Sequence, residues 1–204
     1  TSNVGSFDIS NMNVGDVMYD ASLFYRGMAR KNSSILESLS LTDETYVLVT
    51  CHRAENTDET SRLREIAIGL SSVAEQHRVV LPLHPRTKKA LLEKNLIGLL
   101  GDVETIDPVS FLDMVQLEES ASLIITDSGG VQKEACFFNV RCLTMRDETE
   151  WVETVESNRN KLVGASSIKI KEAASIALNS EVQESTQLYG DGQAAEKIIQ
   201  HLID

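Results

Sequence analysis

The amino-acid sequence predicts an α/β fold built on a doubly wound parallel sheet of about six strands. Short apolar segments rich in β-branched residues alternate with stretches whose apolar residues recur every three or four positions. Such alternation is typical of a parallel sheet whose right-handed crossovers place helices on both faces. The length of 204 residues favours one large domain with appended helices.

Each element of this alternation is predicted by a local pattern. The first strand is expected at 46–50, and the helix after it carries an apolar face of Leu63, Ile66, Ala67, Leu70 and Val73. The remaining strands are expected at 79–83, 103–106, 123–126, 140–145 and 161–163, and the remaining helices at about 87–95, 110–119, from Gly129 onward and 168–179.

Two flanking pieces stand outside the alternation. Residues 1–40 are interpreted as an interdomain linker followed by an amphipathic helix over about 17–40, and 41–188 as the Rossmann-like sheet domain. Tyr189-Gly190-Asp191-Gly192 breaks the chain before a last helix with one apolar face, so 189–204 is expected to pack toward a preceding domain. These flanking pieces indicate that the chain is part of a larger protein.

The net charge of the chain limits the kinds of molecule that it is expected to bind. The 19 basic and 31 acidic residues give a formal charge of -12, which disfavours nucleic acid and anionic membranes. No apolar run approaches the ~20 residues of a spanning helix, and the first residues lack the pattern of a signal peptide. We expect a cytoplasmic protein.

The three cysteines, Cys51, Cys136 and Cys142, are odd in number, lack CxxC spacing and lie in or beside apolar segments. They are interpreted as reduced core thiols. Cys51 beside His52 raises the hypothesis of a nucleophile, but neighbours on an extended segment point to opposite faces, which disfavours it.

The stretch 123–135 is the most informative motif. An apolar strand ends in Asp127-Ser128, which marks a helix start, and Gly129-Gly130 leaves backbone N–H groups open to an anion. Glu134 follows one helical turn later, where a carboxylate could bind a ribose diol. The alternative is an ordinary βα turn with glycines chosen for tightness, and no Walker lysine follows the glycines.

Ligands of doubly wound sheets bind beyond the carboxyl ends of the strands, where this chain gathers basic side chains. His52 and Arg53 follow the first strand, and His52 can donate to a diphosphate and assist its departure. Arg53 could equally hold the turn by pairing with Glu55 or neighbouring loops. The further members of this rim are His84 and Arg86 after the second strand, Ser128 to Gly130 after the fourth, and Arg146 after the fifth. An anionic small ligand explains the set better than chance.

These motifs resemble the non-hydrolysing UDP-N-acetylglucosamine 2-epimerases over nearly the whole chain. The matching segments are 49–56, 84–86, 126–135 and 146–150, together with 15–20 and 189–192. The resemblance implies the second, nucleotide-binding half of a glycosyltransferase-B-type two-domain fold, with the first domain absent from this chain. It also implies UDP-GlcNAc to UDP-ManNAc epimerisation by elimination and re-addition of UDP, without cofactor or metal, by a protein that is commonly a homodimer.

The resemblance also assigns roles. Ser128, Gly129 and Gly130 would hold the diphosphate, Glu134 the ribose, and the segment 108–114, with Met114, would border the uracil. His52 would act on the leaving diphosphate, and Arg53 and Arg146 would line the site. His84 and Arg86 would belong to a second site for the substrate.

Two departures from the family pattern stand out. Trp151-Val152 replaces a common Arg-Pro, which could alter phosphate contacts or mark a subgroup with another acetamido sugar, and Met114 replaces a common aromatic residue. The family's C2 carboxylates lie in the absent domain, so the isolated chain is expected to be inactive. The alternatives are the donor domain of a glycosyltransferase and a non-catalytic nucleotide-sugar-binding module.

Overall fold

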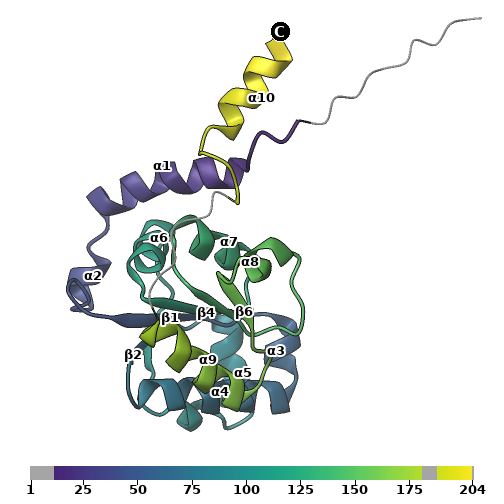
Figure 1. Ribbon diagram of the computed structural model, residues 1–204. Helices are drawn as coiled ribbons and strands as arrows, with labels where there is room; N and C mark the ends of the chain where they lie inside the picture. The colour runs from purple at the N-terminus through teal and green to yellow at the C-terminus, as the bar shows by residue number, and fades with distance from the viewer. Residues whose placement is uncertain (1–11, 181–187, 204) are drawn as a thin grey trace, which may run out of the picture.

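A computed structural model describes residues 12–180 and 188–203 and contains a six-stranded sheet whose adjacent strands all run parallel (Figure 1). The strand order is β3-β2-β1-β4-β5-β6, that of a doubly wound dinucleotide-binding fold. The strands are β1 Tyr46–Thr50, β2 Arg78–Pro82, β3 Glu104–Ile106, β4 Leu123–Thr126, β5 Cys142–Thr144 and β6 Asn160–Leu162. The predicted fold class is confirmed.

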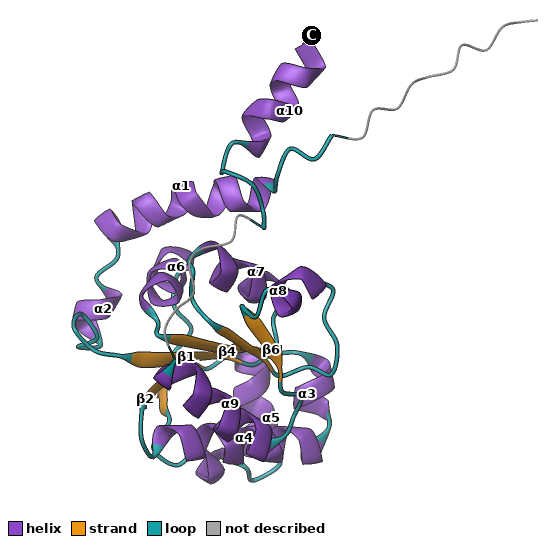
Figure 2. Cartoon of the chain, in the orientation of Figure 1, coloured by secondary structure: helices purple, strands orange, loops and turns teal. Residues whose placement is uncertain are grey.

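Helices cover both faces of the sheet (Figure 2). The helices α3 Ala54–Asp58, α4 Thr60–Ala74, α5 Pro85–Glu93 and α9 Ser167–Asn179 lie on one side, with the 3-10 turn η1 Ile97–Leu100. The other side carries α1 Val17–Asn32, α2 Ile35–Ser38, α6 Phe111–Ser120, α7 Gly129–Phe137 and α8 Val152–Glu156, whereas α10 Ala194–Ile203 projects away from the layers.

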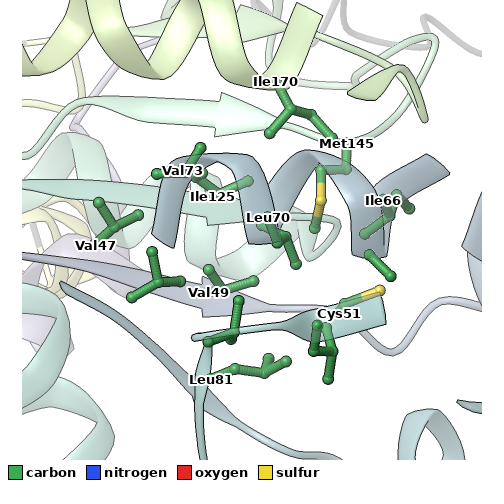
Figure 3. Close-up of a cluster of buried hydrophobic side chains, with 14 of the residues drawn as sticks. Val47, Val49, Cys51, Ile66, Leu70, Val73, Leu81, Ile125, Met145 and Ile170 are labelled. Carbon is green, nitrogen blue, oxygen red and sulfur yellow. The ribbon is translucent and has the colours of Figure 1, made fainter. Parts of the chain in front are cut away.

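Two hydrophobic clusters fill the space between sheet and helices. Figure 3 shows the cluster on the α4 side, where Val49 and Leu81 from the sheet meet Ile66 and Leu70 from the helix. Leu48 and Ile124 point to the opposite cluster, beneath α6 and α7. Every residue of β1 and β4 is buried, as expected for central strands covered on both faces.

The strand order reverses between β1 and β4. The two strands are in register from Val47 opposite Leu123 to Thr50 opposite Thr126, and the hydroxyls of both threonines lie 2.6 Å apart. Because both strands end at the same level, the loops that follow them leave the sheet side by side. This is the topological switch point, where ligands of such sheets bind.

The predicted helix over 17–40 is wrong in its length. It is two helices, α1 and α2, because Ser33 takes an extended backbone between them and its N–H bonds the carbonyl of Ala29. The short helices α3 and α8 carry too few residues for a periodic pattern and were not predicted. The linker, expected from the lack of periodicity over 1–13, lies outside the described residues except for 12 and 13. Among the described helices, none is long and apolar enough to cross a membrane.

Candidate functional site

The loop after β1 is held to the end of β4 by one carboxylate. Asp127 is fully buried, and its oxygens accept the backbone N–H of His52 at 3.0 and 3.1 Å and that of Arg53 at 3.0 Å. The side-chain amide of Asn56 donates to the same carboxylate at 3.1 Å and to the carbonyl of Met145 at 2.9 Å. The loops after β1, β4 and β5 therefore form one connected unit.

This arrangement corrects the expectation that Asp127 and Ser128 together start the helix. Ser128 alone is the N-cap of α7, with its hydroxyl accepting the N–H of Val131 at 3.5 Å. The carboxylate of Asp127 turns away from α7 and toward the loop after β1. Its role is to shape the rim of the site.

The glycines at the start of α7 have ordinary helical backbones, since neither has a positive φ. A Cβ placed on Gly129 would meet no atom closer than 3.5 Å, and one on Gly130 none closer than 3.8 Å. Within the described part of the chain, their N–H groups have no hydrogen-bond partner. Neither the backbone conformation nor the packing of the protein requires glycine at these two positions. Glycine there leaves space for a ligand, which favours an anion cradle over a tight turn.

Charged and aromatic side chains surround Gly129. The position of its missing Cβ lies 3.5 Å from Arg53 Nη2, 3.5 Å from Trp151 Nε1 and 3.9 Å from Glu150 Oε2. The indole of Trp151 donates to the carbonyl of Gly129 at 2.9 Å. Arg53, which could have been a structural residue alone, thus places its guanidinium beside the cradle, and Glu55 pairs with Arg62 at 3.1 Å.

Arg146 is buried and already has a protein partner. Its guanidinium donates to both carboxylate oxygens of Glu150, at 2.8 and 3.0 Å, and this pairing lowers the pKa of Glu150 to about 2. The Nε atom of Arg146 is buried and makes no hydrogen bond among the described residues. Glu150 lies beside Gly129 and holds the guanidinium of Arg146. An anion bound at Gly129 would therefore contact the Arg146–Glu150 ion pair and not an unpaired arginine.

His52 and His84 lie next to each other, with ring centroids 5.4 Å apart. The side chain of His52 is 40% exposed, and its Nδ1 lies 3.7 Å from Asp127 Oδ1. Cys51 points the other way into the core, where burial raises the pKa of its thiol well above the usual value. The nucleophile hypothesis for Cys51 has no support in this geometry, and the two histidine sites predicted separately are contiguous.

Arg86 is turned toward α3. It donates to both carboxylate oxygens of Asp58 at 2.8 Å and to the hydroxyl of Thr57 at 2.9 Å. Its own N–H donates to Nδ1 of His84, which caps α5. In this structure Arg86 connects α3 to α5.

Two interacting carboxyl groups, one half-buried and one buried, lie beside the cradle. Glu134 is half-buried, with Oε2 3.8 Å from the missing Cβ of Gly130, and burial raises the pKa of its carboxyl. Glu118 on α6 is 2% exposed, its Oε2 has no hydrogen-bond partner among the described residues, and burial together with Glu134 raises its pKa well above the usual value. Met114 on α6 is half-buried and packs against the hydrophobic cluster that contains Leu48 and Ile124.

The sequence did not single out several of these residues. Asn56 and Glu150 act through contacts between distant loops, and Glu118 looks like an exposed acid beside Glu119. The one available signal for Asn56 is a short polar side chain directly after a strand at the rim. Over 12–180 and 188–203, no group of three His, Cys, Asp or Glu residues could hold a metal ion.

The doubly wound sheet, with a glycine-lined helix start and basic loops at its switch point, defines a Rossmann-like α/β protein with the fold of the glycosyltransferase-B class. The family model described as UDP-N-acetylglucosamine 2-epimerase matches residues 5–203. The chain belongs to this family.

Individual relatives agree with this assignment. The chain is 46% identical over 192 residues to UDP-2,3-diacetamido-2,3-dideoxy-D-glucuronate 2-epimerase of Pseudomonas aeruginosa, a match covering 94% of this chain and 52% of that protein. It superposes with a TM-score of 0.83 and 39% identity on UDP-GlcNAc 2-epimerase of Methanocaldococcus jannaschii in complex with UDP-GlcNAc and UDP, covering 93% and 54%. The lipopolysaccharide glycosyltransferase WaaG, at 18% identity and a TM-score of 0.50 with 76% and 42% covered, shares the fold alone. The chain spans about half the length of the relatives it matches.

Proposed function

We propose that this chain is the UDP-binding part of an isomerase that converts UDP-GlcNAc to UDP-ManNAc. The observation that carries the proposal is the unobstructed helix start at Gly129 and Gly130, beside Arg53 and at the switch point, in a member of the epimerase family. A nucleotide diphosphate is an anion of the right kind for unpartnered N–H groups at a helix N-terminus.

We assign three regions of the site to the three parts of UDP. The N–H groups of Gly129 and Gly130 and the hydroxyl of Ser128 would hold the diphosphate, with Arg53 and the Arg146–Glu150 pair beside it. The carboxylate of Glu134 would accept the ribose hydroxyls, and Met114 would lie toward the uracil. Glu134 must be ionised for this role, although burial favours its protonated form.

The chemistry starts from a sugar whose C2 proton is not acidic enough for simple removal. Expelling UDP from C1 as the C2 proton leaves gives an unsaturated acetamido sugar, and UDP then adds back while a proton arrives from the other face. His52 would hydrogen-bond the departing diphosphate and, when protonated, offset its charge. The two groups that exchange the C2 proton would come from a domain outside this chain. The chain alone would therefore bind the sugar nucleotide without converting it.

A second substrate is favoured by two observations. The P. aeruginosa relative, at 46% identity, acts on a diacetamido uronate attached to UDP, and this chain carries Trp151-Val152 in place of the Arg-Pro common in the family. Elimination at C1 and C2 is the same for both sugars. The substituents at C3 and C6 would be read by groups beyond the UDP cradle.

We further propose a cytoplasmic homodimer that supplies a sugar nucleotide for cell-surface polysaccharide. The preceding domain would pack against α10, which projects from the sheet layers with Ile199 and Leu202 exposed. Any second substrate site at His84 and Arg86 would share a wall with the first, because the His52 and His84 rings are 5.4 Å apart.

Titration calorimetry with UDP tests the binding step. We expect saturable heat from a single site, together with shifted NMR signals at His52 and Ser128. The absence of both at millimolar UDP would refute nucleotide binding.

Incubation of the complete protein in deuterated water tests the reaction. An epimerase introduces deuterium at C2 of the sugar, whereas a glycosyltransferase donor domain and a binding module do not. Parallel reactions with UDP-GlcNAc and with the diacetamido uronate derivative identify the substrate as the one that exchanges at the lower concentration.

A further inference from the structure

Lys133 on α7 is a charged residue in the interior. It is 6% exposed, and its ammonium group forms an ion pair with the carboxylate of Asp16. Three aromatic rings surround the same ammonium group, with centroids at 4.4 Å for Trp151, 5.1 Å for Tyr189 and 5.8 Å for Phe137. We call Lys133, Asp16, Trp151 and Tyr189 the lysine clasp.

The lysine clasp joins four distant parts of the chain. Asp16 is the N-cap of α1, and its N–H donates to the carbonyl of Tyr189 at 3.0 Å. The Tyr189 hydroxyl donates to Glu153 on α8 at 2.7 Å. Lys133 belongs to α7, and Trp151 directly precedes α8.

The two segments that meet at the clasp approach each other closely. Gly15 and Gly190 both have a positive φ, +101° and +89°, and a Cβ on Gly190 would lie 2.9 Å from the Cα of Gly15. The carboxylate of Asp20 accepts the first N–H groups of α10, from Ala194 at 3.1 Å and Ala195 at 2.7 Å. The direction of α10 is thus set by α1, next to the clasp (Figure 1).

The clasp also reaches the anion cradle. Trp151 lies over the Lys133 ammonium group on one side and donates to the carbonyl of Gly129 on the other. Lys133 itself is one helical turn from Gly129. An apolar side chain could fill this space without the cost of desolvation, so stability alone does not require a lysine at this position.

We propose that Lys133 is a positioning residue that couples the nucleotide cradle at Gly129 and Gly130 to the segments 12–16 and 188–193. These segments precede α1 and α10, on the side where we place the preceding domain. Nucleotide bound at the cradle would stiffen Trp151 and the clasp, and so fix the direction from which groups outside this chain approach the sugar. The nature of the ligand rests on the proposed function.

Hydrogen–deuterium exchange on the complete protein tests the coupling. UDP is expected to slow exchange at the N–H of Asp16, which bonds Tyr189 and touches no part of the cradle. In Lys133→Met, UDP should still protect α7 while the protection at Asp16 is lost, and Lys133→Arg should restore part of it. Lys89→Met, which alters an exposed lysine paired with Glu93, serves as the matched control.

Kinetics separate positioning from mere stability. Lys133→Met is expected to lower kcat on the order of tenfold, since a small misplacement of reacting groups has effects of this size or larger. Because coupling is reciprocal, UDP binding should weaken by no more than the factor by which UDP slows exchange at Asp16 in the parent protein. Equal UDP protection at Asp16 in Lys133→Met and the parent protein would overturn the proposal, as would an unchanged kcat.

The two proposals fail in different ways. A parent protein that gives no heat with UDP contradicts the proposed function. The clasp is then tested without ligand on the 204-residue chain. Lys133→Met should accelerate exchange at Asp16 and at Gln132, whose N–H donates to the carbonyl of Ser128 at 3.2 Å. It should also change the emission of Trp151, the one tryptophan of these 204 residues. Unchanged exchange and emission would overturn it.

Discussion

The carboxylate of Asp127 accepts the backbone N–H of His52 through both oxygens, at 3.0 and 3.1 Å. The same carboxylate is fully buried and also binds Arg53 N and the Asn56 amide. Three donors of the loop after β1 therefore converge on one enclosed acceptor group. The position of His52 relative to the cradle is therefore set from the end of β4.

Replacing this acceptor should destabilise the protein and displace His52. For Asp127→Ala we expect a loss of about 2–4 kcal/mol in the free energy of unfolding, because buried donors lose a charged partner. Urea denaturation measures the loss, and Asp102→Asn on an exposed turn is the control. A loss below about 1 kcal/mol would mean that water or a neighbouring acceptor replaces the carboxylate.

Adding a methyl group at the cradle should separate binding from folding. Gly130→Ala has room within the protein and a helical backbone, so its stability should equal or exceed that of the parent by up to about 1 kcal/mol. The same methyl group would occupy the space for the diphosphate and weaken UDP binding at least tenfold, as measured by calorimetry. Gly27→Ala on α1, where a Cβ meets nothing within 4 Å, should gain stability without changing affinity. Unaltered UDP affinity in Gly130→Ala would argue against the cradle.

Local sequence patterns were sufficient to predict the strands and the polar residues that follow them at one edge of the sheet. The buried runs at 46–50 and 123–126 carry their own signal, and polar residues after each strand are expected at one edge of a parallel sheet. The adjacency of the β1 and β4 loops follows from the strand order, which no local pattern encodes.

Residues whose role depends on distant partners could not be predicted. Lys133 looks like a solvated helix residue, and it becomes buried only because Asp16 and Tyr189, more than 50 residues away on either side, pack over it. Similarly, the sequence alone does not distinguish Glu118, which faces the interior, from its exposed-looking neighbours. The break between α1 and α2 arises at Ser33, whose hydroxyl bonds Asp113 at 2.6 Å on another helix.

The buried acid on α6 should make stability depend on pH. Burial and the neighbouring Glu134 raise the pKa of Glu118 in the folded state, so the folded protein binds more protons than the unfolded one above pH ~4.3. Stability should therefore fall as the pH rises from the unfolded value toward the folded one. Glu118→Gln removes this dependence and should be the more stable protein at pH 8. Melting temperatures of the parent and of Glu118→Gln from pH 5 to 9 measure this pH dependence. If the melting temperatures of both proteins change with pH by the same amount, Glu118 is ionised in the folded state.

His52 and His84 should differ in effect although their rings are neighbours. His52 follows β1 at the switch point and would act on the leaving diphosphate, so His52→Asn should lower kcat of the complete protein on the order of 10²-fold or more, with little change in UDP affinity. His84 caps α5 through Arg86 N, and His84→Asn, whose side chain can still cap the helix, should leave kcat within about threefold. Steady-state kinetics with each variant, beside UDP calorimetry, distinguish the two residues. A larger loss of kcat for His84 than for His52 would transfer the diphosphate role to the loop after β2.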